Sequence, residues 1–96
     1  METIVQFPKI ALKIIKEQEL IIGPLAWDEA RKVVGLSIDQ SQNSVSLSGD
    51  TKDIINRLVA QYERIFGKAS HVVCHDAVID LIKQMPAEEV PESLKE

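Results

Sequence analysis

The stretch Thr51-Lys-Asp-Ile-Ile-Asn-Arg-Leu-Val-Ala-Gln-Tyr-Glu-Arg-Ile-Phe-Gly67 organises the fold of this chain. Its apolar residues recur at spacings of one, three and four, which places them on one broad face at about 100° per residue. They are Ile54, Ile55, Leu58, Val59, Tyr62, Ile65 and Phe66. The spacing therefore predicts an amphipathic helix over residues 51–66.

The two ends of this predicted helix carry ordinary start and stop signals. Either Asp50 or Thr51 can cap the first turn, and with Asp50 as the cap, Asp53 stands at the acidic position of a capping box. Gly67 can adopt the left-handed conformation that closes many helices. The helix is thus expected to begin at residue 50 or 51 and to end at Gly67.

A second helix is predicted immediately afterwards, over residues 68–84. The dipeptide Met85-Pro86 ends it, because the residue before a proline avoids helical geometry. A connection as short as Gly67 implies an antiparallel hairpin or a sharply bent pair. The apolar side chains of this helix are Val73, Cys74, Ala77, Val78, Leu81, Ile82 and Met85.

The first third of the chain repeats this plan loosely. A shift of 44 positions aligns Glu19-Leu-Ile-Ile-Gly23 with Glu63-Arg-Ile-Phe-Gly67, and residues 9–34 with residues 53–78. True duplication and the chance periodicity of two amphipathic helices both account for these matches. The sequence leaves both interpretations open.

Two further helices are predicted before residue 36. The first covers residues 8–22, with residues 1–7 as an extended lead-in or a first helical turn. Gly23-Pro24 ends it and begins the second, over residues 24–34, which Gly35 closes. The apolar face of the first helix is Ile10, Ala11, Ile14, Ile15, Ile21 and Ile22.

Short alternating segments at residues 36–38 and 45–47 flank a run of turn-forming residues. They predict a β-hairpin, with a plain polar loop as the alternative. Residues 86–96 contain two prolines and four glutamates, and they are expected to form a disordered acidic tail. The fold class is therefore mainly α, with four amphipathic helices in two glycine-jointed pairs around a hairpin or loop.

Length and charge limit the classes of function. Ninety-six residues make one domain, expected over residues 1–85. The net charge of −4 argues against a nucleic-acid partner, and no apolar run is long enough to span a membrane. Met1-Glu2 lacks the basic start of a signal peptide, and the single cysteine fits a reducing cytoplasm. We therefore expect a cytoplasmic protein.

The densest group of reactive side chains is His71-Val-Val-Cys74-His75. On a helix His71 is one turn from both Cys74 and His75, so the three could supply ligands to zinc in a metal or redox sensor. However, no fourth ligand and no Cys-x-x-Cys pair is nearby. The interpretation favoured by the helical wheel is that Cys74 points into the apolar face and behaves as a small hydrophobe.

No spacing of residues typical of an enzyme is present. No Ser-His-Asp order, glycine-rich phosphate loop or pair of carboxylates stands out, so we expect no catalytic residue and no cofactor. Ile22-Gly23-Pro24-Leu25-Ala26 resembles the Ile-Gly-Pro-(Ile/Leu)-Ala motif of small helical modules in bacterial signalling proteins. This resemblance implies a regulatory role through protein contacts and without catalysis.

The sequence thus favours a non-enzymatic interaction or regulatory module that pairs with a second copy of itself. The large side chains expected either in the core or at a contact are Trp27, Tyr62 and Phe66. A sensor built on His71, Cys74 and His75 is one alternative. A carrier with an apolar pocket between the helix pairs is another.

Overall fold

The computed structural model describes residues 2–42, 44–86, 88 and 90–94. It is mainly helical, with four helices and a two-stranded antiparallel hairpin between the second and third helices, so the predicted fold class is confirmed. The elements in order are α1 (Glu2–Ile22), α2 (Leu25–Ala30), β1 (Leu36–Asp39), η1 (Gln40–Gln42), β2 (Ser44–Leu47), α3 (Thr51–Phe66), α4 (Lys68–Ile82) and η3 (Glu92–Leu94).

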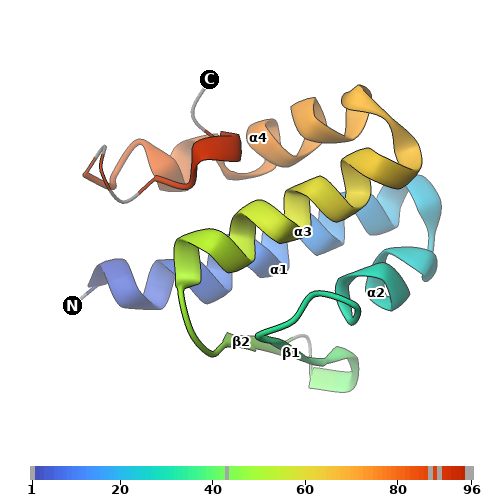
Figure 1. The fold of residues 1–96 in the computed structure, drawn as a ribbon, viewed down its shortest axis with the longest axis horizontal. Coiled ribbons are helices and arrows are strands. Elements are labelled where there is room, and N and C mark those ends of the chain that lie inside the picture. The colour runs from blue at the N-terminus through green and yellow to red at the C-terminus, as the bar shows by residue number, and fades with distance from the viewer. Residues whose placement is uncertain (1, 43, 87, 89, 95–96) are drawn as a thin grey trace.

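Helix α1 lies at the centre of the molecule, because it contacts α2, α3, α4 and β2. Figure 1 shows α1 and α3 running in the same direction, with α4 returning antiparallel to α3. The hairpin lies near the first turns of α3. The joints α1–α2 and α3–α4 are therefore at the same end of the bundle.

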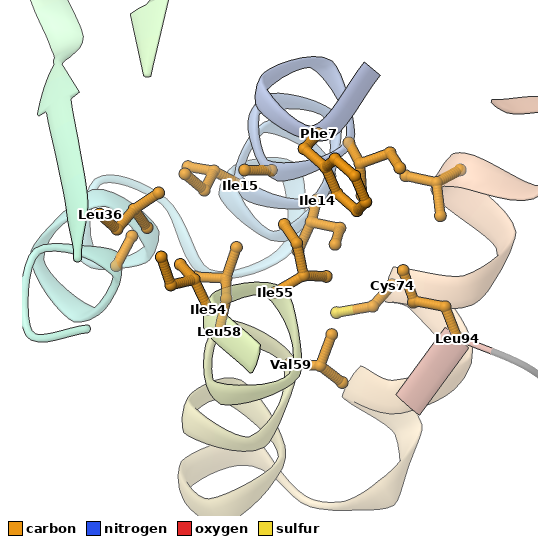
Figure 2. Close-up of a cluster of buried hydrophobic side chains, with 14 of the residues drawn as sticks. Phe7, Ile14, Ile15, Leu36, Ile54, Ile55, Leu58, Val59, Cys74 and Leu94 are labelled. Carbon is orange, nitrogen blue, oxygen red and sulfur yellow. The ribbon is translucent and has the colours of Figure 1, made fainter. Parts of the chain in front are cut away.

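The core is one cluster of buried apolar side chains. Figure 2 shows Ile14 from α1 facing Ile55 from α3, while Val59 from α3 lies beside Cys74 from α4. Leu36 enters the same cluster from the hairpin side. Burial of these side chains supplies the main stabilisation of the fold. The fully buried apolar residues include Ile10, Ala11, Ile14, Ile15, Ile55, Leu58, Val59, Tyr62, Cys74, Val78 and Leu94.

Helix α3 matches its prediction at both ends. The Asp50 carboxylate accepts a hydrogen bond from the backbone N–H of Asp53 over 3.2 Å, so Asp50, and not Thr51, is the cap. Gly67 ends the helix with φ +91°, a conformation that disfavours residues with a Cβ. The sequence thus predicts both ends of the helix, and the structure decides which of the two candidate residues is the cap.

Helix α1 differs from its prediction because it begins at Glu2 and contains Pro8. Pro8 has no N–H, so it contributes no hydrogen bond to the preceding turn. The helix nevertheless continues through it, and Phe7, three positions before Ile10, is buried in the core. At the other end Ile21, predicted on the apolar face, is 62% exposed, whereas Ile22 after it packs against the core.

Helix α2 is shorter than the predicted range of 24–34 and ends at Ala30. After it the chain tightens, since the N–H groups of Lys32 and Val33 bond to carbonyls three residues back. Gly35 then turns the chain with φ +93°. A Cβ on Gly35 would lie 2.8 Å from Ile54 Cδ1 and 2.9 Å from the Ser48 carbonyl oxygen. The hairpin can therefore approach α3 only through a glycine.

Alternation of apolar and polar residues predicts the hairpin, and the structure confirms it over a plain loop. Leu36 pairs with Leu47, and Ile38 pairs with Val45. This register places the four apolar side chains on one face of the two strands. Leu36 is buried in the core, and the other three pack against it.

Helix α4 ends at Ile82, two residues before the predicted end, and Met85 after it is buried. Helices α3 and α4 form an antiparallel hairpin, which is one of the two predicted arrangements, and not a sharply bent pair.

Residues 90–94 do not behave as the expected disordered tail. Val90, Pro91 and Leu94 are buried, and the last of them is in η3, which contacts α3 and α4. The acidic composition predicts disorder, but three apolar side chains are sufficient to pack this segment against α3 and α4. Residues 87, 89, 95 and 96 of the predicted tail lie outside the described part.

The two glycine joints share a positive φ. Gly23 and Gly67 have φ of +74° and +91°. The helices that follow them differ, because α2 has 6 residues and α4 has 15. The similarity of residues 9–34 to residues 53–78 therefore extends to the joints and not to the helices after them.

Candidate functional site

Five large exposed apolar side chains belong to the helix segments on either side of the two joints. Figure 1 shows the α1–α2 and α3–α4 connections at the same end of the bundle. We call the set the apolar end, and its members are Leu20, Ile21, Leu25, Ile65 and Val72. Among the described residues, the other large exposed apolar side chain is Val34, on the turn between α2 and β1.

The apolar end follows from the way the helices stop. Leu20 and Ile21 occupy the last turn of α1 and are exposed, whereas Ile22, the last residue of the helix, packs against the core. Ile65 stands just before Gly67, and Val72 follows on α4. Leu20 is 81% exposed and Val72 is 59% exposed. An apolar group of this kind is typical of a contact surface.

Two open hollows flank the apolar end, and each carries charges of both signs. One, of about 500 Å³, is lined by Glu63, Lys68, His71, Val72 and His75. The other, of about 310 Å³, is lined by Lys13, Lys16, Glu17, Glu19 and Leu20. Both are surface grooves rather than the enclosed apolar cavity that the carrier hypothesis requires.

The structure separates the three residues of the metal hypothesis. His71 and His75 line the larger hollow, whereas Cys74 is fully buried in the core. His71 Nε2 bonds to the Ser93 carbonyl, and its Nδ1 lies 3.8 Å from a Glu63 carboxylate oxygen. In the described part of the chain, no three His, Cys, Asp or Glu side chains form a group suited to a metal ion.

Cys74 is held as an unreactive thiol. Burial raises the pKa of the Cys74 thiol to about 11, against a hydrogen bond from Gln18 that lowers it, and the nearby Glu63 carboxylate adds to the rise. The Gln18 amide donates to Cys74 Sγ over 3.5 Å and to the Ser70 carbonyl over 3.3 Å. Because the thiolate is the nucleophilic form, this thiol is suited to packing rather than to catalysis.

Two of the three predicted anchor residues belong to the core. Trp27 is 1% exposed and Tyr62 is fully buried, so neither can contact another molecule in this conformation. Tyr62 donates a hydrogen bond to the Ala26 carbonyl over 2.6 Å, and burial raises the pKa of its hydroxyl. Phe66 is partly buried and packs against the core beside Gly67.

Two buried polar residues escape the sequence analysis. Gln18 lies three positions after Ile15, so it continues the buried face of α1 and joins that helix to α4. Glu29 is also buried, and its carboxylate accepts hydrogen bonds from Gln61 over 2.7 Å and from Lys32 over 3.2 Å. The bond from Gln61, followed by that from Lys32, lowers the pKa of Glu29 despite burial. Helical spacing places both residues on a buried face, but their hydrogen-bond partners are known only from the packing of the elements.

Within the described residues, no helix combines the length and apolar character needed to cross a membrane. No protein-family model, no curated protein and no solved structure matches this chain.

Proposed function

We propose that this chain is a non-enzymatic interaction module that pairs with a second copy of itself through the apolar end. The observation that carries the proposal is that five large apolar side chains next to the two joints, Leu20, Ile21, Leu25, Ile65 and Val72, are exposed. Full burial of an exposed large apolar side chain gains roughly 1.5–3 kcal/mol, and each of these side chains, already partly covered, gains a fraction of that amount. In a contact between two copies both sets are covered, and the summed gain opposes the loss of free movement on association.

The charges around the apolar end favour a second copy as the partner. A partner of a single charge would require a rim of the opposite sign, but here Glu63 is near Lys68, and Lys16 is near Glu19. In a two-fold contact the same patch meets itself, so an acid of one copy can face a base of the other. A rim with both signs fits that arrangement.

The motif that resembles bacterial signalling modules adds support of a different kind. Ile22-Gly23-Pro24-Leu25-Ala26 forms the α1–α2 joint, where Leu25 is exposed and Ala26 is buried. The same five residues thus turn the chain and present a contact side chain, as a module that acts through protein contacts requires. We accordingly propose a regulatory role for the pairing.

Sedimentation velocity at micromolar concentration tests the proposal. We expect the wild-type protein to sediment as a dimer and the variants Leu20→Glu and Ile65→Glu as monomers, since a buried carboxylate without a partner opposes association. Val34→Glu is the matched control, because Val34 is 75% exposed but lies outside the apolar end. A wild-type monomer at all accessible concentrations would refute self-association.

A charge exchange identifies the two-fold arrangement. Glu63→Lys alone and Lys68→Glu alone should each weaken the dimer by placing like charges across the contact. The double variant restores a rim of both signs and should recover most of the affinity. Equal dimer affinity in all four proteins would place the contact elsewhere.

A further inference from the structure

The segment formed by residues 90–94 occupies a groove between α3 and α4. Val90 is 8% exposed, and Pro91 and Leu94 are fully buried. Leu94 points into the same cluster of side chains as Cys74 and Val59 (Figure 2). Three apolar side chains thus anchor the segment. Val90 and Pro91 lie before Glu92 and Ser93, and Leu94 lies after them.

Side chains of both helices hold the backbone of this segment at Ser93. Asn56 Oδ1, on α3, accepts hydrogen bonds from the Ser93 N–H over 2.9 Å and from the Ser93 hydroxyl over 2.7 Å. His71, on α4, bonds to the Ser93 carbonyl. Both backbone groups of one residue are therefore bound by side chains instead of by regular secondary structure, an arrangement that also suits recognition of a short linear peptide in a groove.

The attachment of this segment is short and local. The carbonyl of Glu88, just before the segment, accepts a hydrogen bond from Lys52 Nζ over 2.5 Å, in an exposed position. The one regular element of the segment, η3, has three residues. Burial of three side chains is largely offset by the conformational entropy lost when the segment is ordered. Segments held in this way open before the rest of a domain unfolds.

We propose that the groove between α3 and α4 is a receptor for a linear segment of another protein, of the pattern apolar-Pro-x-Ser/Thr-Leu, and that residues 90–94 occupy it as an internal competitor. The apolar positions fill the sites of Val90 and Leu94. The hydroxyl residue donates to Asn56, as Ser93 does. Partner binding would then release the chain's own segment.

The tether favours a different protein over a second copy as the occupant. A tethered segment has an effective concentration in the millimolar range, so an identical segment of a second copy at micromolar concentration cannot compete with it. A segment of another protein that binds the groove more tightly can displace the tethered segment. The groove shares His71 with the hollow beside the apolar end, but none of the five side chains of the apolar end contributes a hydrogen bond to Ser93, and the proposal does not depend on self-association.

Fluorescence anisotropy with the full-length chain tests the proposal. The probe is a fluorescein-labelled peptide with the sequence of residues 88–96, and the key variant is Leu94→Asp, which releases the internal segment. We expect Leu94→Asp to bind the peptide at least tenfold more tightly than the wild type does, because the competitor is gone. Adding Asn56→Ala to that variant should weaken binding by about tenfold, since two hydrogen bonds to Ser93 are lost.

The controls separate loss of binding from loss of folding. Circular dichroism must show folded helices in Leu94→Asp; should it unfold, Val90→Asp releases the same segment from a less buried position. Ser46→Ala, exposed on β2, should leave peptide affinity unchanged.

Three results would overturn the proposal. The first is the absence of saturable binding to a folded, released variant. The second is equal peptide affinity of Leu94→Asp with and without the added Asn56→Ala substitution. The third is a dimer that survives Leu20→Glu but disappears in Leu94→Asp, because that result would assign the groove to a second copy.

Discussion

The Tyr62 hydroxyl of α3 donates a hydrogen bond to the backbone carbonyl of Ala26 in α2, over 2.6 Å, in a fully buried position. The bond joins residues 36 positions apart. It satisfies a buried polar group of a six-residue helix that is too short to be stable alone. Tyr62 therefore fixes α2 against α3.

Replacing Tyr62 with Phe removes this bond and preserves the ring. The Ala26 carbonyl then loses the donor that Tyr62 supplies, so we expect the free energy of unfolding to fall by about 1–2 kcal/mol. Urea denaturation followed by circular dichroism measures the change. An unchanged slope with denaturant would show that only stability has changed. An unchanged midpoint would mean that water replaces the phenol without cost.

Replacing Gly35 with Ala tests the close approach of the hairpin to α3. The new residue would have to adopt φ +93°, and its Cβ would lie 2.8 Å from Ile54 Cδ1. Gly23→Ala is the matched control, because Gly23 also has a positive φ, but nothing lies within 4 Å of a Cβ there. The backbone term of about 1–2 kcal/mol is common to both variants. We expect Gly35→Ala to have the lower thermal midpoint, and equal midpoints would contradict the close approach.

The buried thiol of Cys74 gives stability a defined dependence on pH. Its pKa is about 11 in the folded protein, against an ordinary value of 9.0. The unfolded chain therefore loses this proton first, so stability falls as pH rises from 9 to 11, by roughly 2–3 kcal/mol. In Cys74→Ala this contribution is absent. We therefore expect the stability advantage of the wild type over Cys74→Ala to become smaller as pH rises from 9 to 11.

A chemical measurement provides the control for this prediction. A disulfide reagent such as dithionitrobenzoate should not modify Cys74 in the folded protein at pH 8, and it should react at once in denaturant. Rapid reaction without denaturant would show that the thiol is accessible, and the expected pH dependence would then be lost.

Replacing Asp50 with Ala removes the cap of α3. The N–H of Asp53 loses its acceptor at 3.2 Å, and a lost cap typically costs about 1 kcal/mol. Asp50→Asn keeps a side-chain oxygen and should retain most of the stability. Guanidinium denaturation of the three proteins should rank them wild type, Asn, Ala. Equal stability of all three would transfer the capping role to Thr51.

The candidate site is predictable only in part. Periodicity marks the apolar faces, but it places Ile21 and Ile65 on them, although both are exposed at the apolar end. A helical pattern reports which side of a helix is apolar, not how far along its axis a neighbour extends. Trp27 and Tyr62, expected in the core or at a contact, are both buried in the core, because a neighbouring element covers the part of the helix on which each lies.

Helix α3 with its cap, the glycine joint at Gly67 and the hairpin can all be read from the amino-acid sequence, because each depends on residues close together in the chain. Three features depend on packing between distant segments. They are the end of α2 at Ala30, the hydrogen bonds from Gln18 to α4, and the position of residues 90–94 beside Asn56. These outcomes depend on contacts between residues far apart in sequence. Such contacts require the surface of one element to fit another, and that fit exists only after the helices have packed.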